Sequence, residues 1–213
     1  MDELELLKKD WKKGDDKFPK LSYNDLYQMI LKRSSSIVKW IFIISLLEFV
    51  FWLVISFALK DVKGAKTFDE LNANAIVIPL TVFGYIILAY FFYKFYRNYK
   101  TISVTDNAKV LMENILKTRR TVKQYVIYNL AYMAVGMIVG VCIELSQDPF
   151  AINKAHQAAA NGEAFVFYGK VILITAVALV LIIGVLFLFY WLIYGLLLRK
   201  LNRNYKELKK LEV

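Results

Sequence analysis

The stretch "VKWIFIISLLEFVFWLVISFAL", residues Val38–Leu59, decides the fold. After Lys39 its only charged residue is Glu48, and most of the other side chains are apolar. A helix of about 20 apolar residues is long enough to cross the hydrocarbon core of a bilayer. The stretch is therefore predicted to be a membrane-spanning helix.

Three further apolar stretches have this length, at about residues 73–93, 124–145 and 171–198. The whole chain of 213 residues is 58% hydrophobic and has a mean hydropathy of +0.44, which is unusual for a soluble domain. The sequence thus predicts an all-α membrane protein, a four-transmembrane-helix bundle over residues 38–198. The charged start lacks the apolar core of a cleavable signal peptide, so the internal spans are expected to direct insertion.

The basic residues predict the orientation. Most of the 28 lysines and arginines lie in the N-terminal segment, in the connection between the second and third spans, and in the tail. The other two connections hold only Lys60, Lys63, Lys66, Lys154 and Lys170. Since basic residues concentrate in cytoplasmic loops, we expect a multi-pass protein of the inner (plasma) membrane with both termini cytoplasmic.

The tetrapeptide "RNYK" occurs twice, at Arg97–Lys100 and at Arg203–Lys206, each time after an apolar run. The first and third spans also match when the Val-Lys pairs at Val38 and Val122 are aligned, which places Glu48 opposite Tyr132. These matches suggest two parallel helical-hairpin repeats. Shared membrane-flank composition is the alternative explanation. Under either, Arg97, Lys100, Arg203 and Lys206 are predicted to be membrane-surface anchors.

Three polar segments are expected on the cytoplasmic side: residues 1–37, the helical loop 94–123 and the basic tail 199–213. In the first, Leu4, Leu7 and Trp11 share a helix face, and Ser22 and Asp25 have the spacing of a capping box. Two interpretations stay open for this amphipathic helical segment. It lies on the anionic lipids of the inner leaflet, or it docks a protein partner.

Two loops carry helix start signals. "SVTD", from Ser103, is expected to begin a helix that runs directly into the third span. In the loop between the third and fourth spans, Asp148 is a predicted N-cap, Pro149 a first helical residue and Gly162 a stop.

Glu48 is the most informative polar residue. It lies nine residues past Lys39, about 13 Å at the helical rise, and so well inside the hydrocarbon. Ser45 shares its helix face, while Asn129 and Tyr132 of the third span are expected at a similar depth and could hydrogen-bond to it. Either Glu48 binds a cation in a transport pathway, or it is a hydrogen-bonded acid that fixes helix packing.

The stretch "GMIVG", Gly136–Gly140, has the spacing of small residues that lets helices approach closely. Packing within the chain is the preferred interpretation, and a homo-oligomer is the alternative.

No motif of enzyme chemistry is present in the sequence. There is no glycine-rich phosphate loop, no HExxH and no nucleophile elbow, and His156 and Cys142 are the only residues of their kinds. We therefore expect no catalytic residues, no metal site and no cofactor. The basic charge follows from the membrane orientation, so nucleic acid is not an expected partner.

The opening residues "LELLKKDWKK" and "FPKLSYNDLYQMI", followed by "SSSIVKWIFIISLLEFVFW", resemble an uncharacterised family of small bacterial four-span inner-membrane proteins. The resemblance covers about residues 1–55 and implies no activity. From all these features we expect a non-enzymatic accessory or regulatory membrane protein, which docks a cytoplasmic or membrane partner through its N-terminal segment and basic inner face. A small transporter or channel that uses Glu48 is the alternative.

Overall fold

The structure, a computed structural model, describes residues 22–59, 74–103 and 107–211. Its elements are α2 (Tyr23–Leu59), α4 (Asn74–Ser103), α5 (Ala108–Gln147), α6 (Pro149–Ala160) and α7 (Ala164–Leu211). Four of them, α2, α4, α5 and α7, are long and apolar enough to cross a membrane. The predicted all-α, four-span architecture is confirmed. Leu4, Leu7 and Trp11 lie outside the described residues.

The long helices continue well past the length of a bilayer. α2 has 37 residues, α5 has 40 and α7 has 48. At 1.5 Å per residue α7 is about 72 Å long, whereas the hydrocarbon core is about 30 Å thick. The predicted boundary after residue 37 is not a helix end, because residues 23–37 are the first turns of α2 and pack into the bundle.

Helix ends follow local hydrogen bonding. The predicted capping box at α2 is confirmed, since the Asp25 amide donates to Ser22 Oγ (3.2 Å) and the Ser22 amide donates to Asp25 Oδ2 (3.2 Å). The start expected at "SVTD" is wrong: Ser103 ends α4, and Asn107 caps α5 by accepting from the Lys109 amide at 2.8 Å. α5 then runs into the third span without a break, as predicted.

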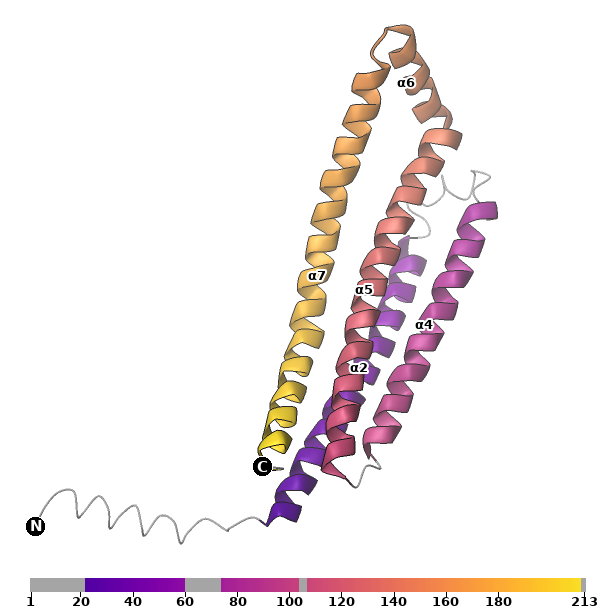
Figure 1. Cartoon of the computed structure of the whole chain (residues 1–213). Coiled ribbons are helices and arrows are strands. Elements are labelled where there is room, and N and C mark those ends of the chain that lie inside the picture. Colours follow the sequence, from indigo (N-terminus) through magenta and orange to yellow (C-terminus); the bar gives the residue numbers. More distant parts are fainter. Residues whose placement is uncertain (1–21, 60–73, 104–106, 212–213) are drawn as a thin grey trace, which may run out of the picture.

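The caps of α6 are as the sequence predicts. Asp148 accepts from the Phe150 amide at 3.2 Å, and Pro149 is the first helical residue. Gly162 follows the helix with a φ of 75°, a left-handed conformation that glycine adopts at low cost. α6 therefore joins the far ends of α5 and α7 as a short, well-capped helix (Figure 1).

The four long helices follow the order α2, α4, α5, α7 around the bundle. α2 packs on α4 and α7, and α5 packs on the same two helices, with a smaller contact between α2 and α5. Neighbours in this ring run antiparallel, as the alternating directions in Figure 1 show. The bundle thus consists of two hairpins, α2–α4 and α5–α7, in the same orientation.

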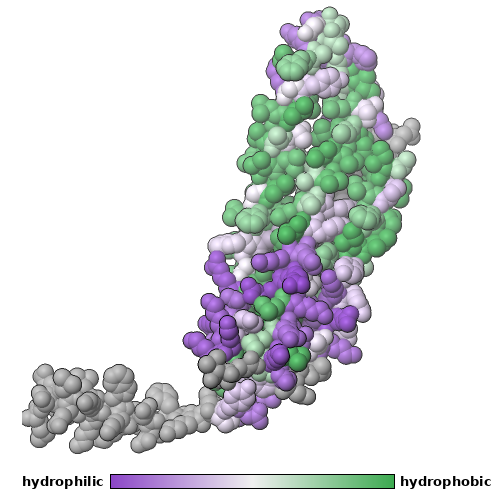
Figure 2. Space-filling view, viewed as in Figure 1, coloured by the Kyte–Doolittle hydropathy of each residue, from purple (hydrophilic) through white to green (hydrophobic). Residues whose placement is uncertain are grey.

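Hydrophilic residues gather at the end of the bundle where α2 begins and α7 ends, and hydrophobic residues cover most of the remainder (Figure 2). We call this the charged end; it comprises residues 22–39, 94–103, 107–123 and 199–211, and the opposite end is the far end. A buried core runs through the charged end and consists of Tyr27, Ile30, Val38, Ile102, Ala108, Leu111, Ile115, Leu201 and Leu208. A second core follows it towards the middle of the bundle: Ile41, Phe91, Phe95, Val122, Tyr125, Tyr190 and Tyr194.

Towards the far end most described side chains face outwards. In the most apolar window of α7 none of the residues is buried, and Val180 is 72% exposed. These exposed side chains are apolar, as expected for a surface that faces lipid. Tight packing is therefore concentrated in the half of the bundle nearer the charged end.

The two hairpins repeat the same pattern of burial. Aligning Val38 with Val122 brings buried residues of α2 and α5 into register: Tyr27 with Leu111, Ser34 with Thr118, and Ile41 with Tyr125. Aligning the "RNYK" copies does the same for α4 and α7: Phe95 with Leu201, Asn98 with Asn204, and Ile102 with Leu208. This agreement supports a structural repeat, since shared flank composition alone does not require matching buried positions.

Candidate functional site

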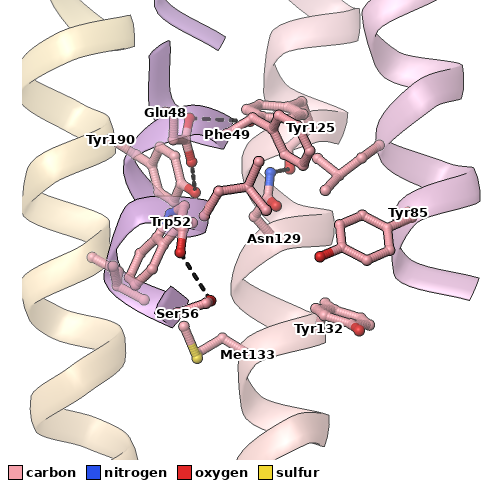
Figure 3. A pocket seen from close by; sticks show the side chains of 13 residues that line it. Glu48, Phe49, Trp52, Ser56, Tyr85, Tyr125, Asn129, Tyr132, Met133 and Tyr190 are labelled. Carbon is pink, nitrogen blue, oxygen red and sulfur yellow. Dashed lines mark hydrogen bonds between the residues drawn. The ribbon is translucent and has the colours of Figure 1, made fainter. Parts of the chain in front are cut away.

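The carboxylate of Glu48 lies at the centre of the bundle, between the second core and a cavity. The side chain is 6% exposed. Tyr125 of α5 and Tyr194 of α7 donate to its Oε2 at 3.0 and 3.1 Å, and Tyr190 of α7 donates to its Oε1. One acidic group is thus hydrogen-bonded by three phenols from two other helices; Figure 3 shows Glu48 with two of them, Tyr125 and Tyr190.

The local sequence explains this arrangement. Tyr190 and Tyr194 are four residues apart, so they lie one above the other on a single face of α7. The three rings also pack on one another, with centroids of Tyr125 and Tyr194 5.9 Å apart and those of Tyr190 and Tyr194 also 5.9 Å apart. Phe95 packs edge-on against Tyr125 at 5.3 Å. The hydroxyl groups are therefore held in place by aromatic packing.

The predicted polar cluster is only partly assembled. Asn129 and Tyr132 line the same cavity as Glu48. Their expected hydrogen bonds to Glu48 are wrong, since the Asn129 amide donates to the Tyr125 carbonyl (3.0 Å) and the Tyr132 hydroxyl donates to the Leu80 carbonyl (3.1 Å). Ser45 is buried and donates to the Phe42 carbonyl at 2.8 Å, on its own helix.

Sequence reasoning missed the three tyrosines because it compared depths along the helix axis alone. Side chains on a helix lean towards its N-terminus. Glu48 on α2 therefore leans towards the charged end, and Tyr190 and Tyr194 on the antiparallel α7 lean the opposite way and meet it. The four-residue spacing of Tyr190 and Tyr194 was the available signal for this site.

A cavity of about 200 Å³ extends from Glu48 towards the far end (Figure 3). It lies between α2, α4, α5 and α7. Its lining residues are Glu48, Phe49, Trp52, Leu53, Ser56, Tyr85, Leu88, Tyr125, Asn129, Tyr132, Met133, Leu186 and Tyr190. The cavity is thus walled mainly by aromatic and aliphatic groups, with a carboxylate at its inner end.

The close helix approach predicted for Gly136 is not found at that residue. A Cβ on Gly136 would have no neighbour within 4 Å, so the packing prediction is wrong for this residue. Gly84 of α4 is closely packed, because a Cβ there would lie 2.5 Å from Tyr132 Oη. In the repeat, Tyr132 corresponds to Glu48, and Gly84 corresponds to Tyr190. Tyr132 contacts Gly84 and Glu48 contacts Tyr190, so equivalent pairs of positions join the two hairpins.

The "RNYK" copies combine two roles. Arg97, Lys100, Arg203 and Lys206 are exposed at the charged end, where a surface anchor is expected. Asn98 and Asn204 are buried, and donate to Thr121 Oγ1 (3.2 Å) and Ser34 Oγ (3.0 Å). Each asparagine therefore links its helix to the other hairpin, a role that the sequence prediction did not include.

The described residues offer no group of three or more His, Cys, Asp or Glu side chains that could hold a metal ion. Glu48 itself offers a hydrogen-bonding, ionisable group in a partly enclosed and mainly apolar surrounding.

Comparison with known proteins places the chain in a family. A family model for a domain of unknown function, DUF8845, matches residues 24–213. The chain belongs to this family. The match covers all four long helices, and an uncharacterised family is what the resemblance of residues 1–55 implied. No curated protein and no solved structure matches the chain.

Proposed function

We propose that this DUF8845 member is a non-enzymatic accessory or regulatory protein of the membrane, which docks a protein partner at its charged end. The main support is the length and packing of that end. A spanning helix needs about 20 residues, yet α2 has 37 and α7 has 48. In the orientation that the basic residues predict, the additional turns at the charged end, residues 23–37 of α2 and 199–211 of α7, lie in the cytoplasm.

The additional turns at the charged end enclose a buried hydrophobic core. Ile30, Leu111 and Leu208 are at most 1% exposed there. The hydrogen bond from Asn204 to Ser34 joins the last described turns of α7 to the first turns of α2. A rigid surface loses little conformational entropy on binding, which favours docking.

A groove between α2 and α4 gives this end a surface with a defined chemistry. Its lining residues are Gln28, Met29, Leu31, Lys32, Ser35, Ser36, Lys39, Tyr99 and Ser103. Met29 is 41% exposed and offers an apolar contact, and Lys32 and Lys39 add positive charge beside it. An acidic protein segment with an apolar anchor would complement this groove.

The experiment is site-specific photo-crosslinking in the native host. A photoreactive residue in place of Met29 should crosslink to one protein, whereas the same residue in place of Ile127, 66% exposed on the apolar part of α5, should not. Lys32→Glu should reduce the crosslink strongly. Lys206→Glu, which changes the net charge equally at another exposed position of the charged end, should leave it unchanged. Removal of residues 1–21 would show whether they contribute.

Two results would contradict docking. Crosslinks to lipid alone from position 29 would assign the charged end to anionic headgroups, which basic residues also attract. Equal effects of Lys32→Glu and Lys206→Glu would indicate a response to overall charge and no specific partner surface.

The cavity favours a second candidate, transport of a cation with Glu48 as the binding group. On the charged-end side, however, the bundle is filled by the apolar side chains of Ile41, Phe95 and Val122, all 0% exposed. The geometry therefore supports binding beside Glu48 better than passage past it. Transport of a radiolabelled cation by reconstituted protein, abolished by Glu48→Gln, would reverse this preference.

A further inference from the structure

The buried carboxyl group of Glu48 lacks a basic partner in the described structure. The three phenols that donate hydrogen bonds to it are neutral. None of the residues that line the cavity is lysine, arginine or histidine. A carboxylate taken out of water is costly unless a positive charge or a full set of hydrogen bonds compensates it.

The hydrogen-bond donors around Glu48 bring no positive charge. Tyr125, Tyr190 and Tyr194 donate to it, and the Trp52 side chain is a fourth neutral donor beside the carboxylate. The phenols also fix the orientation of the side chain, so the group is preorganised beside the cavity. We propose that this cavity binds a small organic cation, of the quaternary ammonium class, with Glu48 as its counter-charge. This site is independent of docking at the charged end.

The walls of the cavity favour an organic cation over an inorganic one. Phe49, Trp52, Tyr85 and Tyr132 surround the space with aromatic rings, and such rings attract a cation over their faces. Ca²⁺ and Mg²⁺ instead require about six oxygen ligands. One carboxylate and scattered hydroxyls do not match that requirement, whereas methyl or ethyl groups around a charged nitrogen would pack on the rings.

The size and position of the cavity fit such a ligand. Its volume is about 200 Å³, and an apolar cavity of about 150 Å³ holds benzene. Ser56, at the other end of the cavity, lies eight residues beyond Glu48, about 12 Å along α2. Since Glu48 is about 13 Å past Lys39, Ser56 comes close to the far boundary of a bilayer core about 30 Å thick. The ligand would therefore enter from the far end.

A neighbouring groove lies on the apolar surface of the bundle. An apolar groove between α2, α5 and α7 is lined by Trp52, Met133, Leu181, Ile182, Val185 and Leu186. It shares Trp52, Met133 and Leu186 with the cavity. Trp52, 36% exposed, thus lies where the two spaces meet and can contact both the ligand and the surrounding lipid.

The test is calorimetric titration of the full chain in lipid nanodiscs with choline and with its uncharged isostere 3,3-dimethyl-1-butanol. Choline should bind saturably and the isostere at least about tenfold more weakly. Glu48→Gln should weaken choline binding about tenfold or more. Trp52→Leu should weaken it about two- to fivefold, since one aromatic face is lost.

Matched variants outside the cavity should bind normally. Glu144→Gln removes an exposed acidic group from α5, and Trp40→Leu removes an exposed tryptophan from α2. Trp52→Leu changes a partly exposed side chain and is therefore expected to fold. It can decide the test if Glu48→Gln does not fold. Equal binding of the two probes, undiminished binding by Glu48→Gln or Trp52→Leu, or no saturable binding of choline would overturn the proposal.

Discussion

The contact between Gly84 and Tyr132 makes a quantitative prediction about how the two hairpins pack. A Cβ at Gly84 would lie 2.5 Å from Tyr132 Oη and 2.6 Å from Cζ, too close for any real contact. In Gly84→Ala the ring must therefore move. It can move only by weakening its hydrogen bond to the Leu80 carbonyl (3.1 Å) and its stacking on Tyr128, whose centroid is 5.8 Å away.

The cost follows from three contributions. Overpacking costs about 1–3 kcal/mol, and a lost hydrogen bond inside a membrane costs about 0.6 kcal/mol. The greater helix propensity of alanine offsets about 1 kcal/mol of this. Gly84→Ala is therefore expected to lower the free energy of unfolding by about 1–2 kcal/mol. Gly184→Ala, on α7 with no atom within 4 Å of the new Cβ, should be neutral or slightly stabilising.

The measurement is reversible unfolding in mixed micelles of SDS and a mild detergent, followed by circular dichroism. Adding Tyr132→Leu to Gly84→Ala should recover part of the loss, with a coupling energy above about 0.5 kcal/mol. If Gly84→Ala and Gly184→Ala unfolded alike, or if the coupling were zero, the close approach of α4 and α5 at this point would be refuted.

Two further predictions concern polar contacts and backbone conformation. Ser34→Ala leaves the buried Asn204 amide without its acceptor and should lower the free energy of unfolding by about 1–2 kcal/mol. The double variant Ser34→Ala with Asn204→Leu should recover most of this loss in the same unfolding assay. No recovery would mean that the hydrogen bond is not what stabilises the contact. Gly162→Ala places a side chain at a φ of 75° and should lower the free energy of unfolding by about 1 kcal/mol. Gly169→Ala lies inside α7 with open space around it and should leave this free energy unchanged. Equal thermal stabilities of the two variants would contradict the assigned turn.

Local signals in the sequence were sufficient wherever neighbouring residues determine structure. The capping box at Ser22 and the cap at Asp148 were predicted correctly because their hydrogen bonds join residues two or three apart. The start at Ser103 was predicted wrongly because two cap residues, Ser103 and Asn107, lie close together in the sequence, and their pattern alone does not distinguish them. The choice between them depends on where α4 ends.

The site required information that no local pattern holds. Glu48 was identified from its depth in an apolar helix, yet its partners depend on the stagger of α2 against α7 and on the direction in which side chains lean. The small-residue pattern at Gly136 likewise marked a glycine with open space around it, while Gly84, which carries no such spacing, meets the ring of Tyr132. Small size permits close approach, but the relative rotation of the helices decides which glycine is used.

By itself, the sequence determined the four apolar spans and the concentration of charge in three segments, and it suggested a repeat of two hairpins. These properties depend on composition and period, since each helix satisfies its own backbone and responds to the membrane individually. Only the tertiary structure decided that the helices continue beyond the bilayer as one packed bundle, that the "RNYK" asparagines join the hairpins, and that three tyrosines surround Glu48 beside a cavity. Such contacts join residues up to 170 positions apart, and their geometry arises only when the helices pack together.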